Sequence, residues 1–228
     1  MKNREGGFSL VELMITLAII GIIFSLGLPA FATYIGNAKL RASAESFLAG
    51  IQTARTEAVK LNTNVEFLLT NDAPVPDDGS NANYPVMADA VVIGRRAANR
   101  PTAAANAANW VIRTLPAVPP CGVNNASDPN LACWFIEGKR GAEGSGRAQT
   151  EASPVLINSA TSSITFNGLG GTTLAAAATF QFTNPSAGNC SSGSPAGPIR
   201  CLNVRVSPGG QAKLCDPAIA DASDTRAC

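Results

Sequence analysis

The N-terminal part of the chain is dominated by one apolar stretch, residues 8–34, in which Glu12 is the single charged side chain. About 20 apolar residues in a helix, rising ~1.5 Å each, cover the hydrocarbon core of a bilayer. A short basic segment precedes this stretch, and Gly6 and Gly7 stand before it. In a secretory signal peptide, the small residues at the cleavage site follow the apolar core. Cleavage here would leave the hydrophobic helix on the protein, so the pattern predicts a membrane anchor.

Beyond this stretch, the apolar period predicts that the helix continues through residues 35–61 as an amphipathic half. Its apolar stripe, expected to pack against a domain, consists of Leu40, Ala44, Phe47, Leu48, Ile51, Ala54, Ala58 and Leu61. Pro29 removes a backbone hydrogen bond and is expected to kink the helix. Gly21 adds a second weak point, and together with Ser25 it forms a small-residue pair that would let another helix approach closely. Ordinary membrane-helix composition explains this pair equally well.

From residue 62 onward, the hydrophobic period changes to two, which is typical of strands. Strands are expected at residues 65–69, 86–95, 110–118, 132–137, 155–158, 162–167, 178–183 and 199–207. Residues 70–83, rich in Pro and Asp, are expected to form a loop, and residues 97–109 a short helix or an irregular excursion. The chain is therefore expected to have an α+β fold, in which a long helix packs on an antiparallel sheet domain of residues 62–228.

The composition narrows the choice of function. The segment after the helix, about 165 residues, is long enough for one domain with a core of its own. The chain has 17 basic and 16 acidic residues, and residues 1–7 hold two of the former and one of the latter, so their loss would leave 15 of each. This neutral balance gives no general electrostatic case for a nucleic-acid partner. The absence of histidine excludes histidine-based catalysis and histidine-ligated zinc.

The six cysteines lie well beyond the apolar stretch and contain no CxxC pair. An even number without metal-site spacing, in an exported domain, is typical of disulfides. Fifteen pairings are open in principle for six cysteines. Nearest-neighbour pairing is preferred because it closes three short loops of similar length, through Cys121–Cys133, Cys190–Cys201 and Cys215–Cys228. The thiols would then face an oxidising compartment, and the basic N-terminal segment would stay in the cytoplasm.

The stretch GGFSLVELMITLAIIGIIFSLGLPAF resembles the class III signal of type IV pilins and type II secretion pseudopilins. That pattern is a basic leader ending in Gly, then Phe, Glu at the fifth mature position, and an apolar helix with Pro near its far end. Gly7, Phe8, Glu12 and Pro29 occupy the matching positions. A buried carboxylate costs roughly 2.5–3.5 kcal/mol on insertion scales, so an intramembrane Glu points to a function. A simple bitopic anchor would have no reason to place it there.

The resemblance implies how the N-terminus is used. Residues 1–7 would be a leader that prepilin peptidase removes after Gly7, and the new N-terminal residue Phe8 would be methylated. Residues 8–34 would span the inner membrane once, with the remainder in the periplasm. Glu12 would then dock on the N-terminal amine of a neighbouring subunit, because a pair of opposite charges is tolerated in the membrane where a single one is not. Inner-membrane lipid and the assembly platform would be further partners.

A narrower resemblance covers the last third of the chain. The segments SSITFNGLGG, ATFQFTN and RCLNVRVSPGGQAKLC are similar to the GspH/FimT branch of minor pilins, which includes FimU-like proteins. The ending CDPAIADASDTRAC resembles minor pilins with a disulfide-closed C-terminal loop. This resemblance implies a type IV pilin fold and a minor pilin that enters a pilus at or near its tip, beside other minor pilins and the major pilin. It would help to initiate assembly, with roles in twitching motility, adhesion or DNA uptake.

Two alternative functions are compatible with the same sequence segments. The first is a GspH-type pseudopilin of a type II secretion system, although pseudopilins of this branch more often lack a cysteine-rich C-terminal third. The second is DNA capture, since some FimT proteins carry Gly-Arg-x-Arg in the final hairpin. At the matching place this chain reads Gly210-Gln211-Ala212-Lys213. Lys213 and Arg205 could make a weak contact with DNA, but three nearby aspartates oppose a phosphate site.

An enzymatic function is the least supported. The sequence offers no activated nucleophile or metal cluster, so no catalytic residue, metal or cofactor is expected. The glycines of residues 168–171 superficially resemble a phosphate loop, but they lack a Lys and a following helix, and they are interpreted as a turn.

Overall fold

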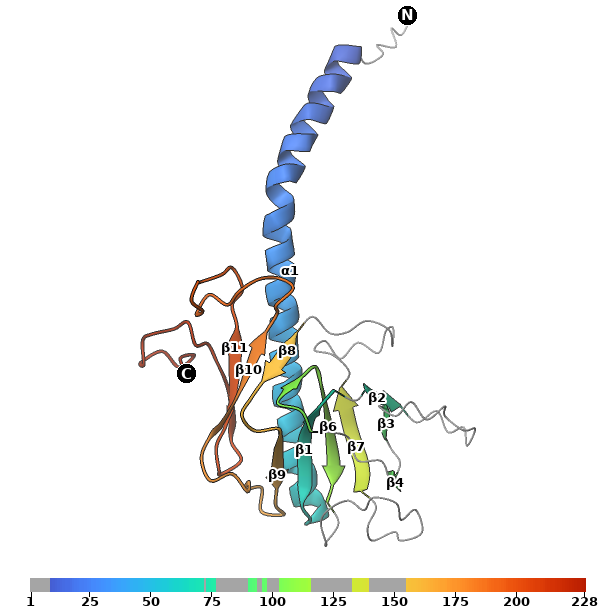
Figure 1. Ribbon diagram of the computed structural model, residues 1–228, viewed down its shortest axis with the longest axis vertical. Coiled ribbons are helices and arrows are strands. Elements are labelled where there is room, and N and C mark those ends of the chain that lie inside the picture. Colours follow the sequence, from blue (N-terminus) through green and yellow to red (C-terminus); the bar gives the residue numbers. More distant parts are fainter. Residues whose placement is uncertain are drawn as a thin grey trace, which may run out of the picture.

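The structure is organised around one long helix (Figure 1). It is a computed structural model that describes residues 9–71, 73–76, 90–93, 96–97, 103–115, 133–139 and 155–228. Helix α1 (Leu10–Leu61) is continuous over 52 residues. Its N-terminal half projects away from the molecule, and its C-terminal half lies against the β-sheets. The helix ends at Asn62, which adopts a left-handed conformation (φ 48°) and donates its backbone N–H to the carbonyls of Ala58 and Val59.

The C-terminal half of α1 buries one stripe, as the 3.6-residue period predicts. Leu40, Ala44, Phe47, Ile51, Ala54 and Ala58 are fully buried, and Leu48 is partly buried against the same core. Leu61 departs from the prediction: it is 46 % exposed, because the helix ends there and the chain turns away through Asn62. The stripe is therefore confirmed along its length except at the last residue.

The first sheet has the strand order β4-β7-β6-β1-β9. Its strands are β1 (Val65–Thr70), β4 (Arg96–Ala97), β6 (Asn109–Thr114), β7 (Cys133–Lys139) and β9 (Ser163–Phe166). All neighbours in it are antiparallel, and Phe67 at its centre is paired with Ile112 on one side and Ile164 on the other. The pairing of β1 with β9 joins segments about a hundred residues apart in the chain, and no local pattern in the sequence indicates it.

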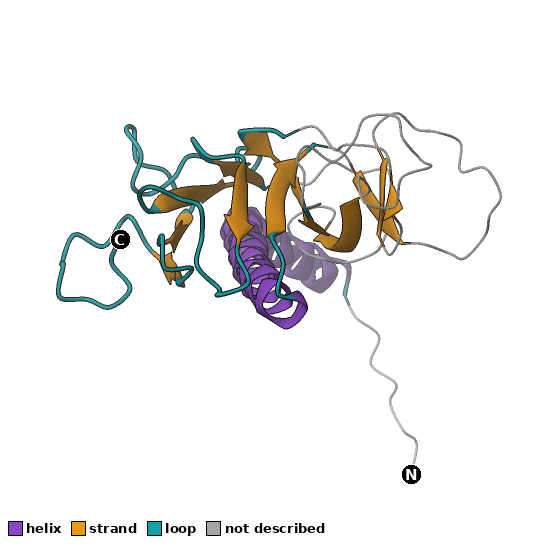
Figure 2. Cartoon of the chain, turned by 90° about the horizontal axis from the view of Figure 1, so that it is seen from below, coloured by secondary structure: helices purple, strands orange, loops and turns teal. Residues whose placement is uncertain are grey.

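The second sheet has the order β12-β11-β10-β8-β5 and is also antiparallel. Its strands are β5 (Asn106–Ala107), β8 (Leu156–Asn158), β10 (Ala178–Thr183), β11 (Leu202–Val206) and β12 (Ala212–Cys215). Val204 and Val206 share one face of β11 and are buried, and Leu202 on the same face is partly buried. The two sheets together cover one side of the helix (Figure 2), which confirms the α+β architecture of a long helix packed on antiparallel sheets.

Phe47 of α1 lies where the helix and both sheets meet. Its ring centroid is 4.8 Å from that of Phe67 in the first sheet, and 5.0 and 5.3 Å from those of Phe180 and Phe182 in the second. Large aromatic side chains contribute much of the buried area of a core and prefer such tilted or edge-on contacts. This single cluster therefore holds the helix against both sheets.

The face of the first sheet that points away from the helix is also closed. Leu68, Val111 and Phe135 form a second, smaller buried cluster there. Beside it, Glu66 and Arg113 face each other across β1 and β6 and form a buried ion pair. Strand β1 is therefore buried on both faces, and even the Glu66 side chain is only 12 % exposed, unlike the one-sided strand that simple alternation predicts.

One local prediction is wrong, and of a second only the helix alternative is wrong. Residues 73–76, expected within a loop, form strand β2 (Ala73–Pro76), which pairs in parallel with β3 (Ala90–Ile93). A two-stranded pair leaves each strand one free edge, so the prolines of β2 break no inner ladder. The described part of 97–109 contains no helix and instead contributes to β4, β5 and β6. Short strands of two residues are held by their partners and leave no periodic signal of their own.

Candidate functional site

The projecting half of α1 is an apolar surface that the rest of the molecule leaves open. From Leu10 to Phe31 its large apolar side chains, where described, are 46–75 % exposed. Among the described residues, α1 is the one helix long and apolar enough to cross a membrane. An apolar surface of this extent requires lipid or other apolar helices around it. By length and composition, this part of the molecule is suited to anchoring it in a membrane.

Glu12 lies in the first turn of this helix and is exposed. Ser9 caps the helix, because its Oγ accepts a hydrogen bond from the backbone N–H of Glu12 at 3.2 Å. The spacing Ser-x-x-Glu is that of a capping box, a signal the sequence analysis missed. A carboxylate in the first helical turn also interacts favourably with the helix dipole. The structure thus gives Glu12 a local role besides the predicted docking role, which stays a prediction.

The expected weak points of the membrane half fall inside an unbroken helix. A Cβ built on Gly21 would meet no atom within 4 Å, so this position is an open surface on the isolated chain. The helix continues through Pro29, and its N-terminal half curves gently (Figure 1). A localised kink at Pro29 stays a prediction, as does helix packing at Gly21. Gly7 and Phe8 lie outside the described residues.

The glycine-rich turn at 168–171 packs on the C-terminal half of α1 rather than forming a phosphate loop. Its Gly170 carbonyl accepts a hydrogen bond from Arg55 Nε at 3.0 Å. The turn of the closing hairpin, 207–210, lies against it, since Pro208 accepts a hydrogen bond from the Thr172 amide at 2.9 Å. Gly170 and Gly210 both have positive φ, and a Cβ on Gly210 would lie 2.1 Å from the Gly170 oxygen. Only glycine permits this close approach.

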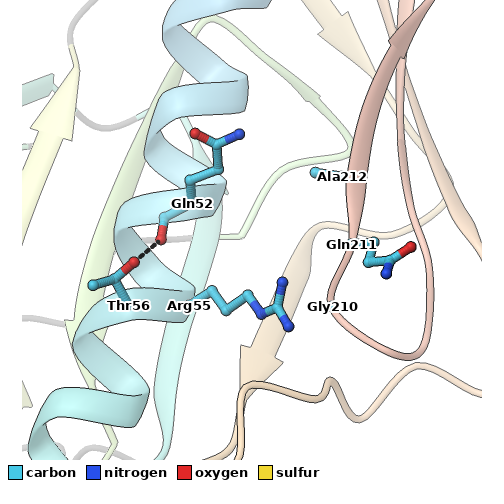
Figure 3. A pocket seen from close by; sticks show the side chains of 6 residues that line it. All are labelled: Gln52, Arg55, Thr56, Gly210, Gln211 and Ala212. Carbon is cyan, nitrogen blue, oxygen red and sulfur yellow. Dashed lines mark hydrogen bonds between the residues drawn. The ribbon is translucent and has the colours of Figure 1, made fainter.

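Between the helix and this hairpin lies a groove of about 470 Å³ (Figure 3). It is lined by Gln52, Arg55 and Thr56 of α1 and by Gly210, Gln211 and Ala212 of the hairpin. The Arg55 guanidinium extends from the helix toward the turn at Gly210. Sequence analysis did not single out Arg55, because one more cation on an amphipathic helix looks like an ordinary solvated residue.

Two of the three predicted disulfides are present. Cys190–Cys201 and Cys215–Cys228 are bonded as nearest-neighbour pairing predicts. The third, Cys121–Cys133, cannot be placed, because Cys121 lies outside the described residues. The confirmed pairs close two loops at the C-terminal end of the chain, one before β11 and one after β12.

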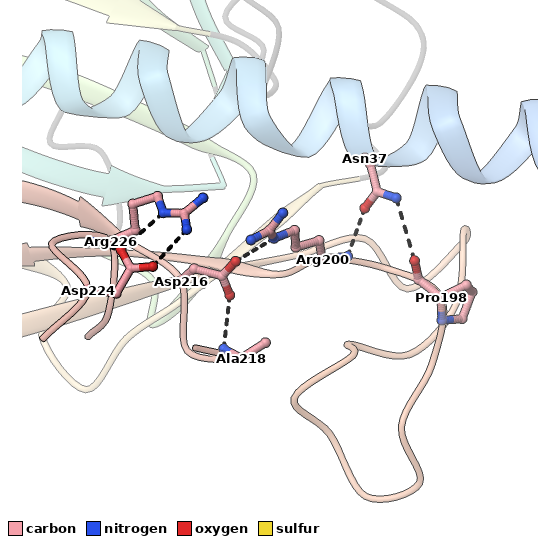
Figure 4. Close-up of polar contacts among 7 residues, drawn as sticks. All are labelled: Asn37, Pro198, Arg200, Asp216, Ala218, Asp224 and Arg226. Carbon is pink, nitrogen blue, oxygen red and sulfur yellow. Dashed lines mark hydrogen bonds and ion pairs between the residues drawn. The ribbon is translucent and has the colours of Figure 1, made fainter. Parts of the chain in front are cut away.

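A chain of polar contacts joins these two loops to the helix (Figure 4). Asn37 of α1 accepts a hydrogen bond from the backbone N–H of Arg200 at 2.7 Å, next to Cys201. The Arg200 side chain forms an ion pair with Asp216, next to Cys215, and the Asp216 carboxylate also accepts from the Ala218 amide at 2.9 Å. The Asp216 side chain is only 4 % exposed, so its charge needs these partners. The contacts orient both loops relative to the point where α1 leaves the domain.

Within the C-terminal loop, Arg226 binds Asp224 through two nitrogens, at 2.7 and 3.1 Å. This hydrogen bonding lowers the pKa of Asp224 to about 2. Hydrogen bonds from Ser223 lower the pKa of Asp221 as well. Both carboxylates are therefore ionised at neutral pH, and the loop presents negative charge near the hairpin.

The two cations proposed for a DNA contact are engaged by the C-terminal loop. Arg205 and Lys213 face each other across β11 and β12. Arg205 Nη1 donates to the Cys228 carbonyl at 2.5 Å, and Lys213 Nζ donates to the Ala227 carbonyl at 2.9 Å. These residues serve to hold the loop, which weakens the interpretation as a phosphate-binding site. Within the described ranges, no group of three or more acidic or cysteine side chains has the arrangement of a metal site.

Residues 43–210 match the family described as "Type II transport protein GspH", and residues 2–28 match the "Prokaryotic N-terminal methylation motif". The first match spans most of the chain. With its helix-on-sheet fold and its prepilin-type N-terminus, the chain is a type IV pilin-like protein. It belongs to the GspH family, which comprises minor pilins and pseudopilins.

Similarity to individual proteins covers only part of the chain or is low in sequence identity. The chain is 50 % identical over 38 residues to the fimbrial protein of Moraxella nonliquefaciens, covering 17 % of this chain and 25 % of that one. It is 30 % identical over 94 residues to the type IV major fimbrial protein FimA of Dichelobacter nodosus, covering 37 % and 59 %. It thus spans a quarter to about three fifths of these relatives. The minor pilin FimU of Pseudomonas aeruginosa is similar in structure, with 13 % identity, 80 % and 98 % coverage and a TM-score of 0.43.

Proposed function

We propose that this protein is a minor pilin of a type IV pilus, incorporated at or near the tip, where it helps to initiate assembly. The observation that carries the proposal is the single continuous helix α1. The large apolar side chains of its N-terminal half are exposed wherever they are described, while its other half is packed against the sheet domain. A subunit of this shape can leave a membrane only if other apolar helices replace the lipid, as they do in a filament core.

The N-terminus supplies the specificity of this step. Prepilin peptidase removes residues 1–7, and Phe8 becomes the methylated N-terminal residue. The helix cap at Ser9 then lies immediately after the new amine, and Glu12 lies one helical turn further on. An amine and a carboxylate of adjacent subunits, brought together in an apolar surrounding, satisfy each other's charge and fix the register of the two helices.

The proposed topology follows from the same elements. Residues 8–34 span the inner membrane with the N-terminus in the cytoplasm, and residues 35–61 and 62–228 lie in the periplasm until the subunit enters the pilus at the cell surface. The two disulfides support this placement, because disulfides persist in oxidising compartments such as the periplasm. The partners of the protein are the other minor pilins, the major pilin, the peptidase, the assembly platform and lipid.

A second candidate function is that of a minor pseudopilin in a type II secretion system. The description of the matching family favours it, since it names a type II transport protein. The fold and the N-terminal motif serve both machines equally. The C-terminal third, tied by two disulfides and their polar contacts, favours the pilus. DNA capture is not proposed, because Arg205 and Lys213 are held by the C-terminal loop.

Deletion of the gene, followed by complementation, distinguishes the two machines. For a minor pilin, deletion should sharply reduce surface pili and twitching, leave exoprotein secretion intact, and be reversed by the complementing chain. Mass spectrometry of sheared pili should find the processed protein in small amounts relative to the major pilin. Normal piliation with lost secretion would assign the protein to type II secretion instead.

A further inference from the structure

The groove between α1 and the β11–β12 hairpin contains the guanidinium of Arg55, most of whose N–H donors have no partner among the described residues. Arg55 is half-buried, and its Nε donates to the Gly170 carbonyl. A guanidinium has five N–H donors, so this bond leaves the four on its terminal nitrogens. Across the described part of the chain, Arg55 has no acidic partner, whereas Arg113, Arg200 and Arg226 each have one.

The surroundings hold the guanidinium in place rather than letting it move with the solvent. The Gly170 oxygen fixes its Nε, and Gly170 and Gly210 approach it so closely that a Cβ on either would lie 3.1–3.3 Å from that nitrogen. Gln52 and Gln211 stand on the two sides of the groove and are exposed, so their amides can add donors. A positioned guanidinium with free paired donors is the group that proteins use to bind carboxylates in a bidentate manner.

We propose that this groove receives the carboxylate of an Asp or Glu side chain from an adjacent pilin subunit. This inference rests on the proposed function, because it requires that subunits pack beside α1. The groove opens on the uncovered side of the helix: Gln52 and Thr56 are exposed and lie on the same face as the exposed Arg41 and Glu45. That face continues into the apolar half of α1, where neighbouring helices would pack.

Size and charge favour a side chain over a nucleic acid. A groove of about 470 Å³ has ample room for a neighbour's side chain, and the described residues that line it include one cation, Arg55. Phosphate backbones are bound by several cations along a surface, and the nearby Arg205 and Lys213 are engaged by the C-terminal loop. A single acidic side chain fits both the charge and the volume, and it would specify which subunit follows in the assembly.

The test uses the full chain, expressed in cells that assemble the pilus, with a benzophenone amino acid in place of the exposed Gln211. After irradiation, the adduct is purified from sheared filaments and its attachment site is mapped by mass spectrometry. We expect attachment to another pilin subunit, within a peptide that contains Asp or Glu. Attachment to lipid or nucleic acid, or to a peptide without an acidic residue, overturns the proposal.

Charge variants then test the role of Arg55. Gln52→Glu places an anion in the groove without touching the bond to Gly170, and should reduce adduct yield by at least about fivefold, because like charges repel at short range. Ser192→Glu is the matched control: this exposed residue lies in the Cys190–Cys201 loop, whose Arg200 contacts Asn37, and Asn37 lies roughly 20 Å along the helix from Gln52 at ~1.5 Å per residue. Its adduct yield should stay at the wild-type level.

The last experiment combines Arg55→Glu in this chain with replacement of the mapped acidic residue of the adjacent subunit by Arg. Each change alone should reduce the yield, and the two together should restore it. Equal yields with and without Gln52→Glu, or no restoration by the exchanged charges, contradict the inference. If filaments contain the wild-type chain but no adduct forms, the inference fails while the proposed function stands. If the chain never enters filaments, the proposed function fails and the inference with it.

Discussion

Glu12 is the residue at which local and assembly roles must be separated. It is the single charge in an apolar stretch, and its backbone N–H completes the helix cap on Ser9. Because the cap uses the backbone of residue 12, a change of its side chain leaves that hydrogen bond intact. Substitution at this position therefore probes the carboxylate alone.

We predict that Glu12→Gln and Glu12→Leu are processed and inserted into the membrane but fail to enter filaments. Both remove a charge whose insertion costs roughly 2.5–3.5 kcal/mol at mid-bilayer, so insertion itself should not suffer. Glu12→Asp keeps the charge but retracts it by one methylene, and should be incorporated at an intermediate level. Immunoblots of membranes and of sheared filaments measure both steps.

Thr16→Val provides the matched control for these variants. Thr16 lies one turn after Glu12 and is exposed, and its hydroxyl donates a hydrogen bond to the Leu13 carbonyl at 2.9 Å. Its replacement removes a polar group of the same helix face without removing charge, and should leave incorporation unchanged. Wild-type amounts of Glu12→Leu in sheared filaments would indicate that the helix is a simple membrane anchor.

Asp224 gives a second prediction at the scale of single residues. Its pKa is lowered from the ordinary 3.8 to about 2 by Arg226. Because the folded-state pKa lies below the unfolded one, the ionised carboxylate stabilises the loop above pH 3.8, and this contribution is lost as the pH falls from 3.8 to about 2. Carbon-13 NMR of the full chain in micelles should show this midpoint, and Arg226→Gln should raise it toward 3.8. An unchanged midpoint in the variant would refute the assignment to Arg226.

At the scale of elements, the contact of α1 with β6 depends on a glycine. A Cβ on Gly50 would lie 2.5 Å from the ring of Trp110, which stacks on Phe67. Glycine in a helix interior is unfavourable by about 1 kcal/mol relative to alanine. Here the close packing of helix on sheet outweighs that propensity, so the residue that weakens the isolated helix strengthens the fold.

We predict that Gly50→Ala lowers the stability of the sheet domain by about 1–3 kcal/mol, the usual cost of overpacking a core. Gly21→Ala adds the same methyl group to the same helix where nothing lies within 4 Å, and should leave the unfolding temperature of the domain unchanged. Thermal unfolding followed by tryptophan fluorescence compares the two. Equal unfolding temperatures for wild type and Gly50→Ala would show that Trp110 can move aside without cost.

At the scale of the whole molecule, the two disulfides and the contacts between them hold the two C-terminal loops in place. Arg200 and Asp216 link the loops, and Asn37 links them to the helix. The last residues would otherwise fray, because within the described structure the tail has few buried side chains beyond Asp216. The loop after β12 is therefore held by covalent closure and polar contacts, whereas the strands before it belong to the hydrophobic core.

We predict that Cys215→Ser combined with Cys228→Ser costs roughly 3 kcal/mol of folding stability, the chain-entropy value for a loop of this length. Denaturant unfolding of the full chain in detergent, under non-reducing conditions, measures this loss. Loss of the loop should also free Arg205 and Lys213 from the Ala227 and Cys228 carbonyls. Unchanged stability in the double variant would mean that the Arg200–Asp216 ion pair holds the loop without the covalent bond.

Features that depend on neighbours along the chain can be predicted from the residues alone. The buried stripe from Leu40 to Ala58 follows from the helical period, the exposed half from its unbroken apolar composition, and the buried face of β11 from alternation. The two confirmed disulfides follow from short loop closure. The capping box at Ser9 was also present in the sequence as a spacing, although it was not used.

Which distant segments meet becomes apparent only in the folded chain. Strand β9 pairs with β1, and the proline-containing β2 pairs with β3, because strand pairing depends on backbone partners that no local period specifies. The roles of Arg55, Arg200 and Asp216 likewise emerge only when loops far apart in the chain converge on one helix. A polar side chain has the same appearance in a sequence whether it faces solvent or a partner, and only the folded chain supplies the partner.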